Sequence, residues 1–482
     1  MKIKVLHHAA EGDQGKANEM TKIQRNPDPI LHPFAREREY QRALNSVKIE
    51  KMFEQPFVKA LDNHFDAVRV IKRSNVSATR LYSGACDGEI LLWDLGYSKV
   101  QSRWKAHTGF VRGIIEEPNL NSMNSIFTCG DDKCIHWWDL NQLNGSNLEN
   151  EAEATSSAFA SKQHALNTSN YNVDKTSANQ ILPKHTYRTT SPITSIDHHW
   201  SKPMLISTGE TVDVWDRNRS QPVSSIEWGC EQVFTAKFNP AEPCLIAATA
   251  ADNSISLYDL RQSTQQGAIR KVLLKNRSNA LCWNPQEPTH FTAANENGHL
   301  YSFDMRKLTH ALTVHQDHQM PVLDIDFAPN GQEFVSASYD KTIRVWSRDG
   351  QKSKHCYHTK RMQRVLTCQF STDGRFVFSG SEDHNVRIWK ANASEKLGTV
   401  SEREKKSIYY KQKLVEKFSA CREISKIKKF QRLPKQMKNN MEKQKIMKDA
   451  KKRKDENRRA HSAVGSVPFE SERNKFVRGE LE

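Results

Sequence analysis

A repeated unit that ends in an aromatic residue constrains the fold of this 482-residue chain more than any other feature. Its clearest copy is the stretch 321–346, PVLDIDFAPNGQEFVSASYDKTIRVW. Apolar and polar residues alternate there in three short segments, residues 322–327, 333–337 and 342–346. Alternation with period two, interrupted by an Asn-Gly turn and then by an Asp-centred turn, predicts antiparallel strands joined by hairpins.

The unit recurs along the chain. Its copies end at Trp93, Trp138, Trp215, Tyr258, Phe303, Trp346 and Trp389. Five of the six intervals lie in the range of ~40–45 residues that is typical of β-propeller blades. The interval between the second and third copies is longer and indicates an insertion. The units resemble WD repeats, so we predict an all-β fold, a seven-bladed WD-repeat β-propeller over residues 56–395, with blades numbered in this order.

The resemblance to WD-repeat proteins also implies how the ring closes. Each sequence unit of such a protein begins with the outer strand of the preceding blade, and the unit that ends at Trp389 lacks its own outer strand. We therefore expect residues 57–61 to pair with blade 7. Closure removes exposed sheet edges. It also predicts that the N-terminal arm and the C-terminal tail leave the propeller near the same blade.

Three blades carry the residues from which WD-repeat proteins build a hydrogen-bonded chain beneath the blade. These structural tetrads are His64, Ser83, Asp87 and Trp93; His107, Thr128, Asp132 and Trp138; and His318, Ser336, Asp340 and Trp346. A Ser-His-Asp set also suggests a hydrolase, but an active site does not recur around a ring and needs an exposed nucleophile. We predict no catalytic residue and no enzyme. Blades 3 to 5 lack the histidine and are expected to rely on apolar packing.

Two segments interrupt or precede the propeller. Residues 141–190 are rich in Ser, Asn, Ala and Glu, which predicts a disordered insertion between blades 2 and 3. In the N-terminal arm, residues 1–55, apolar residues recur at helical spacing and predict a helix over residues 33–53. We expect its apolar face to pack on the propeller or on a partner. RNA contact through Arg36, Arg38 and Arg42 is the weaker alternative, because Glu37 and Glu39 offset them.

Most of the positive charge lies in the C-terminal tail, residues 396–482. The tail holds 26 Lys and Arg against 12 Asp and Glu, whereas the whole chain has 72 against 56. This asymmetry predicts an acidic partner for the tail, and a nucleic acid is the partner that it favours most. The tail is predicted to be mainly α-helical, with amphipathic helices over 403–430, a break at Pro434, and then a long basic helix or an arm that folds on binding. The candidate RNA- or protein-binding residues are Lys426, Lys428, Lys429, Arg432, Lys451, Lys452, Arg453, Lys454, Arg458 and Arg459.

Several other patterns leave alternatives open. The basic run 451–454 also fits a nuclear import signal. The run 360–364 either touches phosphate or is ordinary loop charge. The nine cysteines form no CxxC pair and indicate reduced thiols; a zinc site on Cys129 and Cys134 would lack a second ligand pair. No apolar run is long enough for a membrane span, and no phosphate-binding glycine loop is found. We expect no metal, cofactor, membrane or small-molecule substrate.

The arm LHPFAREREYQRALNSVKIEKMFEQPF, a seven-bladed propeller and a basic tail containing Arg-Leu-Pro together resemble the Sof family, the suppressor-of-fibrillarin type of ribosome-biogenesis factor. The resemblance implies a ribonucleoprotein component of the small-subunit processome in the nucleus and nucleolus. Such a protein acts in rRNA processing and 18S rRNA maturation, with processome proteins, pre-rRNA and guide small nucleolar RNA as partners.

A second resemblance involves the ends of two blades. Tyr258-Asp259-Leu260-Arg261 and Phe303-Asp304-Met305-Arg306 resemble the motif of WD-repeat substrate receptors of cullin–RING ubiquitin ligases. It implies that Arg261 and Arg306 meet the ligase adaptor. The alternative is that both arginines pair with neighbouring carboxylates on the propeller rim.

Overall fold

The computed structural model describes residues 29–118, 125–140, 182–227, 232–262, 267–463 and 465–481. The chain divides into two compact units. One unit combines the residues up to Phe53 with Lys396–Phe430, and the other combines Glu54–Glu395 with Gln431–Glu482. The tail that we predicted as one domain, residues 396–482, is therefore shared between the two units.

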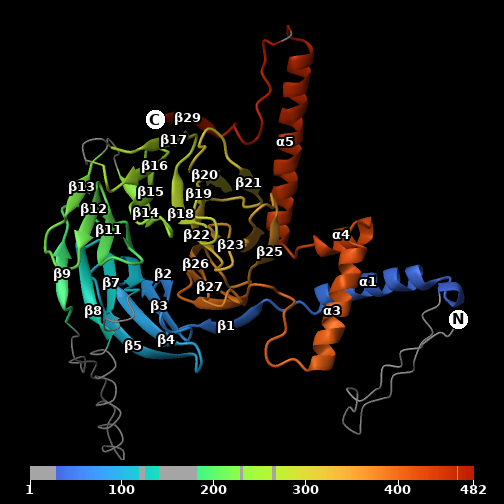
Figure 1. Cartoon of the computed structure of the whole chain (residues 1–482), viewed down its shortest axis with the longest axis horizontal. Helices are drawn as coiled ribbons and strands as arrows, with labels where there is room; N and C mark the ends of the chain where they lie inside the picture. Colours follow the sequence, from blue (N-terminus) through green and yellow to red (C-terminus); the bar gives the residue numbers. More distant parts are fainter. Residues whose placement is uncertain are drawn as a thin grey trace, which may run out of the picture. The chain divides into compact units, whose positions relative to one another are not determined.

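The larger unit holds seven antiparallel sheets, which confirms the predicted seven-bladed propeller (Figure 1). Blades 1 to 3 consist of β2 (Val68–Arg73), β3 (Arg80–Ala85), β4 (Glu89–Asp94) and β5 (Lys99–Lys105); β6 (Val111–Glu116), β7 (Ser125–Gly130), β8 (Cys134–Asp139) and β9 (His185–Arg188); and β10 (Ser195–His198), β11 (Met204–Thr208), β12 (Val212–Asp216) and β13 (Ser224–Ile226).

Blades 4 to 6 continue this order along the chain. They consist of β14 (Val233–Phe238), β15 (Leu245–Ala250), β16 (Ser254–Asp259) and β17 (Arg270–Leu274); β18 (Ser278–Trp283), β19 (His290–Asn295), β20 (His299–Asp304) and β21 (Thr313–Gln316); and β22 (Val322–Phe327), β23 (Glu333–Ser338), β24 (Ile343–Ser347) and β25 (Ser353–Tyr357).

Blade 7 closes the ring as the sequence predicts. Its strands are β26 (Val365–Phe370), β27 (Phe376–Ser381), β28 (Val386–Lys390) and, from the other end of the propeller, β1 (Phe57–Leu61). Phe57 pairs with Trp389 and Leu61 with Val386, and the Lys390 amide donates to the Pro56 carbonyl at 2.8 Å. The two ends of the propeller segment therefore leave it side by side at this blade.

The predicted insertion differs from the structure at its C-terminal boundary. Residues 141–181 lie outside the described residues. His185–Arg188, which the sequence predicts to lie in the insertion, form β9, the outer strand of blade 2. Tyr187 is buried on this strand, and β9 supplies the hydrogen-bond partners that the edge of β8 needs.

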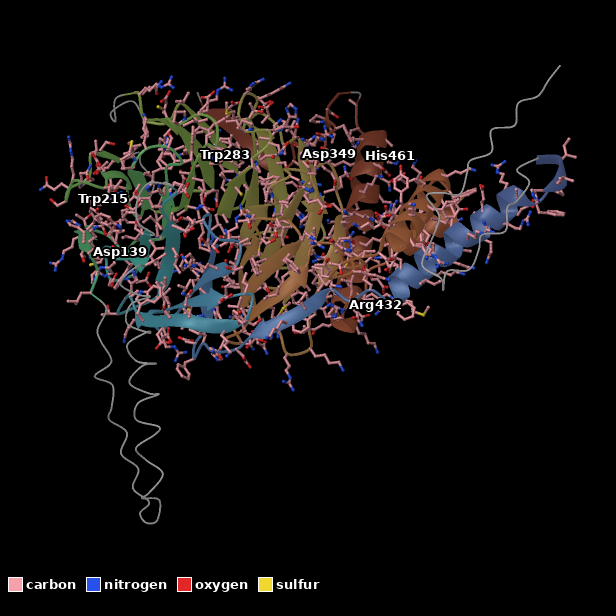
Figure 2. The ribbon with its side chains drawn as sticks, turned by 60° about the horizontal axis from the view of Figure 1, so that its bottom comes forward. Asp139, Trp215, Trp283, Asp349, Arg432 and His461 are labelled. Atoms are coloured by element: carbon pink, nitrogen blue, oxygen red, sulfur yellow. The ribbon has the colours of Figure 1, made fainter. Side chains whose placement is uncertain are left out.

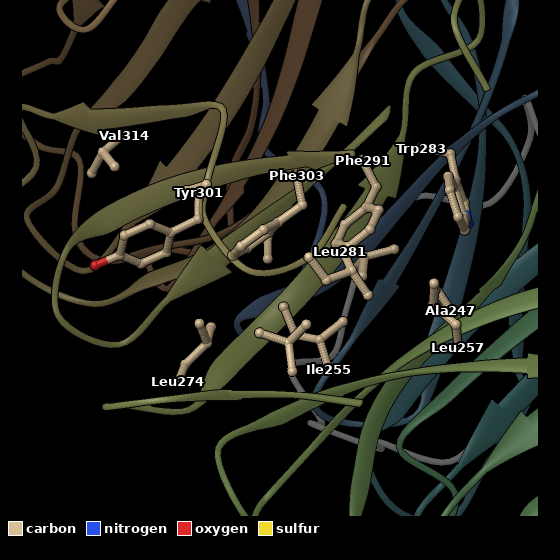
Figure 3. Close-up of a cluster of buried hydrophobic side chains, with 14 of the residues drawn as sticks. Ala247, Ile255, Leu257, Leu274, Leu281, Trp283, Phe291, Tyr301, Phe303 and Val314 are labelled. Carbon is tan, nitrogen blue, oxygen red and sulfur yellow. The ribbon is translucent and has the colours of Figure 1, made fainter. Parts of the chain in front are cut away.

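The apolar core lies between adjacent blades. One cluster packs Leu257 of blade 4 against Leu281, Phe291 and Phe303 of blade 5 (Figure 3). All four side chains are buried, and burying a side chain of this size contributes about 1.5–3 kcal/mol. Packing of this kind recurs around the ring, so each blade is held mainly by its neighbours.

The smaller unit consists of helices that come from both ends of the chain. Helix α1 (Ala35–Met52) follows a short 3-10 turn, η2 (Pro29–Leu31), and packs against α3 (Glu402–Lys417) and α4 (Arg422–Lys428). The buried residues shared by the helices are Ala43, Leu44, Val47, Leu414, Val415, Phe418 and Ile424. The structure thus confirms the N-terminal helix. The expectation that its apolar face packs on the propeller or on a partner is wrong, because this face packs on the tail helices.

The rest of the tail belongs to the propeller unit. Helix α5 (Lys435–Ala460) begins directly after Pro434 and runs beside β21 and β25 (Figure 1). Arg432 precedes this helix and His461 follows it, as Figure 2 shows. The last strand, β29 (Val477–Leu481), pairs antiparallel with β17 and gives blade 4 a fifth strand that the sequence analysis did not predict.

Candidate functional site

Two of the three predicted tetrads are complete. In blade 6, His318 Nδ1 donates to Asp340 at 2.7 Å, and its Nε2 accepts from Ser336 Oγ at 2.7 Å. Trp346 Nε1 donates to the same hydroxyl at 2.8 Å. Blade 2 repeats the arrangement with His107, Thr128, Asp132 and Trp138, at distances of 2.9–3.0 Å. A fully satisfied buried chain of this kind ties the strands of a blade together.

The tetrad of blade 1 is incomplete. Ser83 contacts both His64 Nε2 and Trp93 Nε1 at 2.6 Å, but Asp87 caps the following turn through the Glu89 amide. His64 Nδ1 is buried and has no hydrogen-bond partner among the described residues. Burial lowers the pKa of His64 to about 3, and the nearby Arg103 acts in the same direction.

Blades 3 and 5 contradict the expectation that they rely on apolar packing alone. Trp215 Nε1 donates to Ser207 at 2.8 Å in blade 3. In blade 5, Ser302 contacts Thr292 at 2.9 Å and His315 at 3.1 Å. His315 lies on the outer strand of its blade, so the spacing that identifies tetrad histidines could not find it.

The Ser-His-Asp sets do not form an active site. Ser336 is fully buried, and its hydroxyl is already occupied by an imidazole and an indole N–H. A nucleophile must instead be accessible and lie near donors for the developing oxyanion.

Three potential metal ligands meet in blade 2. His107, Asp132 and His136 bring ligand atoms within 4.8 Å of one another. Both ring nitrogens of His107 are used inside the tetrad, so a metal ion would have to break it. Cys129 and Cys134 are the sequence candidates for zinc, and burial raises the pKa of both thiols. We therefore assign His107 and Asp132 to the hydrogen-bonded tetrad that stabilises blade 2.

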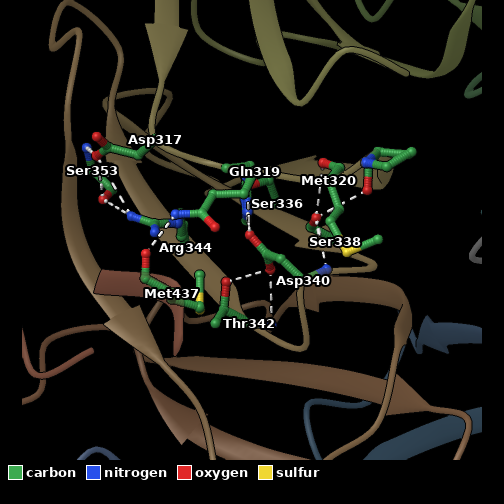
Figure 4. A network of polar contacts seen from close by, with 12 residues as sticks. Asp317, Gln319, Met320, Ser336, Ser338, Asp340, Thr342, Arg344, Ser353 and Met437 are labelled. Atoms are coloured by element: carbon green, nitrogen blue, oxygen red, sulfur yellow. Dashed lines mark hydrogen bonds and ion pairs between the residues drawn. The ribbon is translucent and has the colours of Figure 1, made fainter. Parts of the chain in front are cut away.

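A polar network anchors the tail on blade 6 (Figure 4). Gln319 follows the tetrad histidine, and its side chain donates to the Met437 carbonyl in the first turn of α5 at 2.8 Å. Gln431 donates to the Ser353 carbonyl and hydroxyl at 2.6 and 3.0 Å. Ser353 also accepts from Arg344, which is completely buried beside Asp317.

A second anchor lies further along α5. Lys448 donates to Gln316 at 3.0 Å, and the Gln316 amide reaches Glu472 at 3.2 Å. Beyond Glu472, Phe476 packs on His299 and Tyr301, and β29 completes blade 4. The tail is therefore bound to blades 4, 5 and 6 on both sides of its basic segment.

The basic segment itself remains at the surface. The exposed cations of this part of α5 are Lys451, Lys452, Arg453, Lys454 and Arg458. Arg459 is half-buried and stacks on Phe469 at 5.0 Å, while Lys452 lies 3.9 Å from Glu456. Arg432 is exposed just before the helix, and Lys426, Lys428 and Lys429 are exposed on the helical unit. The predicted tail cations are thus divided between two units.

The two arginines of the blade-end motif lie on one face. The amides of Arg261 and Arg306 donate to Asp259 and Asp304 at 2.9 and 3.0 Å, and both residues are exposed. The structure places these motif turns at the ends of strands in adjacent blades. Arg270 joins them, because it donates to the Arg306 carbonyl at 2.6 Å and lies 3.7 Å from Glu480 of β29.

Comparison with known proteins agrees with this architecture. A Sof1-like domain matches residues 391–477, and WD repeats match residues 98–139, 306–347 and 351–390. "DDB1- and CUL4-associated factor 13" of Danio rerio is 41% identical, and that of Homo sapiens 40%, over 99% of both chains. "Protein SOF1" of Saccharomyces cerevisiae is 35% identical over 99% of this chain and 95% of that protein.

The solved structures include the WD40 propeller domain of Doa1, with a TM-score of 0.52 and 18% identity over 70% of this chain and 96% of that one. This likeness concerns the fold alone. Within the described residues, none of the helices has the length and apolar character needed to cross a membrane.

Proposed function

Because this chain belongs to the Sof1-like family of WD-repeat proteins, we propose that it is a non-enzymatic scaffold of the small-subunit processome in the nucleolus. In this role it supports early pre-rRNA processing and 18S rRNA maturation. The propeller binds neighbouring processome proteins, and the basic tail binds pre-rRNA or those proteins. The observation that carries the proposal is helix α5, whose basic segment is exposed while the propeller holds the tail on both sides of it.

The positive charge of α5 is held in a fixed place on the propeller unit. Lysines and arginines along a helix neutralise phosphates and release counterions without reading base sequence. A basic segment whose flanking residues are anchored on both sides loses less conformational freedom on binding than a free arm would. The tail is thus suited to hold RNA against a rigid protein framework.

The test compares two variants that lose the same charge on the same helix. One carries glutamine at Lys451, Lys452, Arg453 and Lys454, and the control carries glutamine at Lys435, Lys438, Lys443 and Lys445, all of which are exposed. Both variants receive an added nuclear import signal, because the first cluster also resembles one. In vitro, the slope of log K against log salt should fall by about 0.7 for each phosphate that the variant no longer neutralises.

In cells, crosslinking of the tagged protein and sequencing of the attached RNA should recover pre-rRNA and its guide small nucleolar RNA. We expect the first variant to lose these reads and the control to retain most of them. If the first variant enters the nucleolus and crosslinks like the unaltered protein, the tail is not the RNA anchor.

A second function is favoured by the exposed pair Arg261 and Arg306. Relatives at 40–41% identity bear the name "DDB1- and CUL4-associated factor 13", and both arginines belong to the blade-end motif that resembles the one in ligase substrate receptors. Arg261→Ala with Arg306→Ala should then abolish copurification of adaptor and cullin while leaving RNA association intact. Arg219→Ala, at another exposed turn, is the matched control. Retention of the adaptor by the double variant would exclude this docking mode.

A further inference from the structure

A ring of β-bulges marks one face of the propeller. Six of the seven innermost strands carry a register shift at their second residue. A bulge re-aims the side chain that it carries. We call the face at which these strands begin the upper face. The six residues at the bulges are half-buried: Arg69, Arg112, Phe234, Asn279, Leu323 and Leu366.

The two arginines of this ring lie in the adjacent blades 1 and 2. Arg112 forms a bidentate ion pair with Asp131, at 2.6 and 3.0 Å. The Arg69 side chain forms no hydrogen bond or ion pair within the described part of the chain. Burial lowers the pKa of Arg69, and the nearby Arg112 adds to this effect. A partly desolvated guanidinium without an acceptor is unfavourable, so an anionic ligand would stabilise it.

Exposed aromatic rings precede the innermost strands of the same two blades. Phe65 precedes β2 and is 74% exposed, and Phe110 precedes β6 and is 45% exposed. Arg103 lies over the Phe65 ring at 4.9 Å, and Arg112 lies over the Phe110 ring at 5.5 Å. Exposed rings supported by guanidinium groups are stacking platforms for unpaired bases.

The same face is cationic on blades 6 and 7. Lys341, Lys360, Arg361 and Arg364 are all exposed there, on the β23–β24 turn and on the segment before β26. Arg364 also lies over the Tyr339 ring at 5.2 Å and forms an exposed ion pair with Glu382, at 3.7 Å. Because β1 closes the ring at blade 7, blades 6, 7, 1 and 2 form one continuous arc.

We propose that this upper-face arc binds a single-stranded polynucleotide. The cations of blades 6 and 7 and Arg69 receive the phosphates, and Phe65 and Phe110 receive bases. An acidic peptide would satisfy the cations but would leave the two exposed rings without a role. A duplex would hide its bases from them. The first turn of α5 lies beside this arc, because Gln319 contacts both Asp340 and the Met437 carbonyl. The arc uses none of the α5 cations, so the inference goes beyond the tail function proposed above and does not depend on it.

The test maps contacts on the full chain with photoreactive 12-mers, using 4-thiouridine RNA in one arm and 4-thiothymidine DNA in the other. Crosslinked peptides are identified by mass spectrometry. We expect crosslinks at the peptides that contain Phe65 and Phe110, in the RNA arm or in both arms. Phe65→Ala with Phe110→Ala should reduce these crosslinks at least tenfold, while those in residues 435–460 persist.

Two controls keep the result interpretable. Tyr97→Ala removes a ring that is 81% exposed on the β4–β5 turn, at the opposite face of blade 1, and should change nothing. The melting temperatures of all variants should agree, since the altered side chains are exposed. Crosslinks confined to residues 435–460 would overturn the proposal. So would an equal loss in the Tyr97 variant, or protection of the face by polyglutamate but not by oligonucleotide.

Discussion

Acid should destabilise this propeller through histidines that are buried in the neutral state. His64 and His315 are 5% and 0% exposed, and burial lowers their pKa values to about 3 and about 4. His64 Nδ1 has no acceptor within the described residues, so protonation would place an uncompensated charge inside blade 1. The matched perturbation is His64→Gln, which removes the titrating ring and retains an acceptor for Ser83.

Because the pKa values of both histidines are lowered in the folded state, the free energy of unfolding falls as the pH falls. The unfolded chain takes up a proton near pH 6.5, whereas the folded protein resists protonation until pH 3 to 4. The stabilisation from each histidine is therefore fully present above pH 6.5 and is lost as pH falls towards the folded pKa. Between pH 7.5 and pH 5, each group should remove roughly 2 kcal/mol from the free energy of unfolding.

The assay is urea unfolding followed by tryptophan fluorescence at pH 7.5, 6.0 and 5.0. His64→Gln should lose about 2 kcal/mol less than the unaltered protein over this range. The control, Trp93→Phe, loosens the same blade without removing a titrating group and should shift the curves equally at every pH. An unchanged pH dependence in His64→Gln would refute the assignment of a neutral, buried imidazole.

Three further predictions test the framework. Ser336→Ala leaves an indole and an imidazole nitrogen without a partner and should cost about 2–4 kcal/mol, measured by urea unfolding; a loss below about 1 kcal/mol would contradict the tetrad as a stabilising unit. Phe57→Ala removes an edge-to-face contact with Trp389, at 5.5 Å between ring centroids, and should cost at least about 0.5–1.5 kcal/mol at the ring closure; hydrogen exchange should then rise first in β1 and β28. Gln431→Ala should raise amide exchange at the start of α5 without altering the blade strands, and equal exchange in both proteins would show that this anchor does not hold the helix.

The closed ring gives a physical reason for the arrangement of both termini. The N-terminal strand and the last strand of the propeller segment pair in blade 7, so the arm and the tail leave the propeller at one place. The tail then supplies α3 and α4 to a helical unit with α1, and α5 and β29 to the propeller unit. Losing the tail would therefore remove both the partners of α1 and the fifth strand of blade 4.

The sequence by itself determined the strands and the seven repeated units, because period-two alternation and a constant repeat length are local properties. The propeller and its closure followed from the resemblance of these units to WD repeats. The tetrads of blades 2 and 6 were predictable for the same reason, since their residues keep a fixed spacing. Blade 1 shows the limit of spacing: Asp87 stands at the expected position, but its carboxylate caps a turn and does not reach His64.

Only the tertiary structure decided which elements α1 and β29 pack against. The predicted stripe of α1 could not identify α3 and α4 as its partners, since complementary faces so far apart along the chain leave no local signal. In blade 5, His315 lies on the outer strand and contacts Ser302, in place of a tetrad histidine before the innermost strand. Strand β29 pairs with the edge of blade 4 through backbone hydrogen bonds, which any short extended segment can form. The bulges at Arg69 and Arg112 arise from strand pairing, which is a property of the assembled sheet.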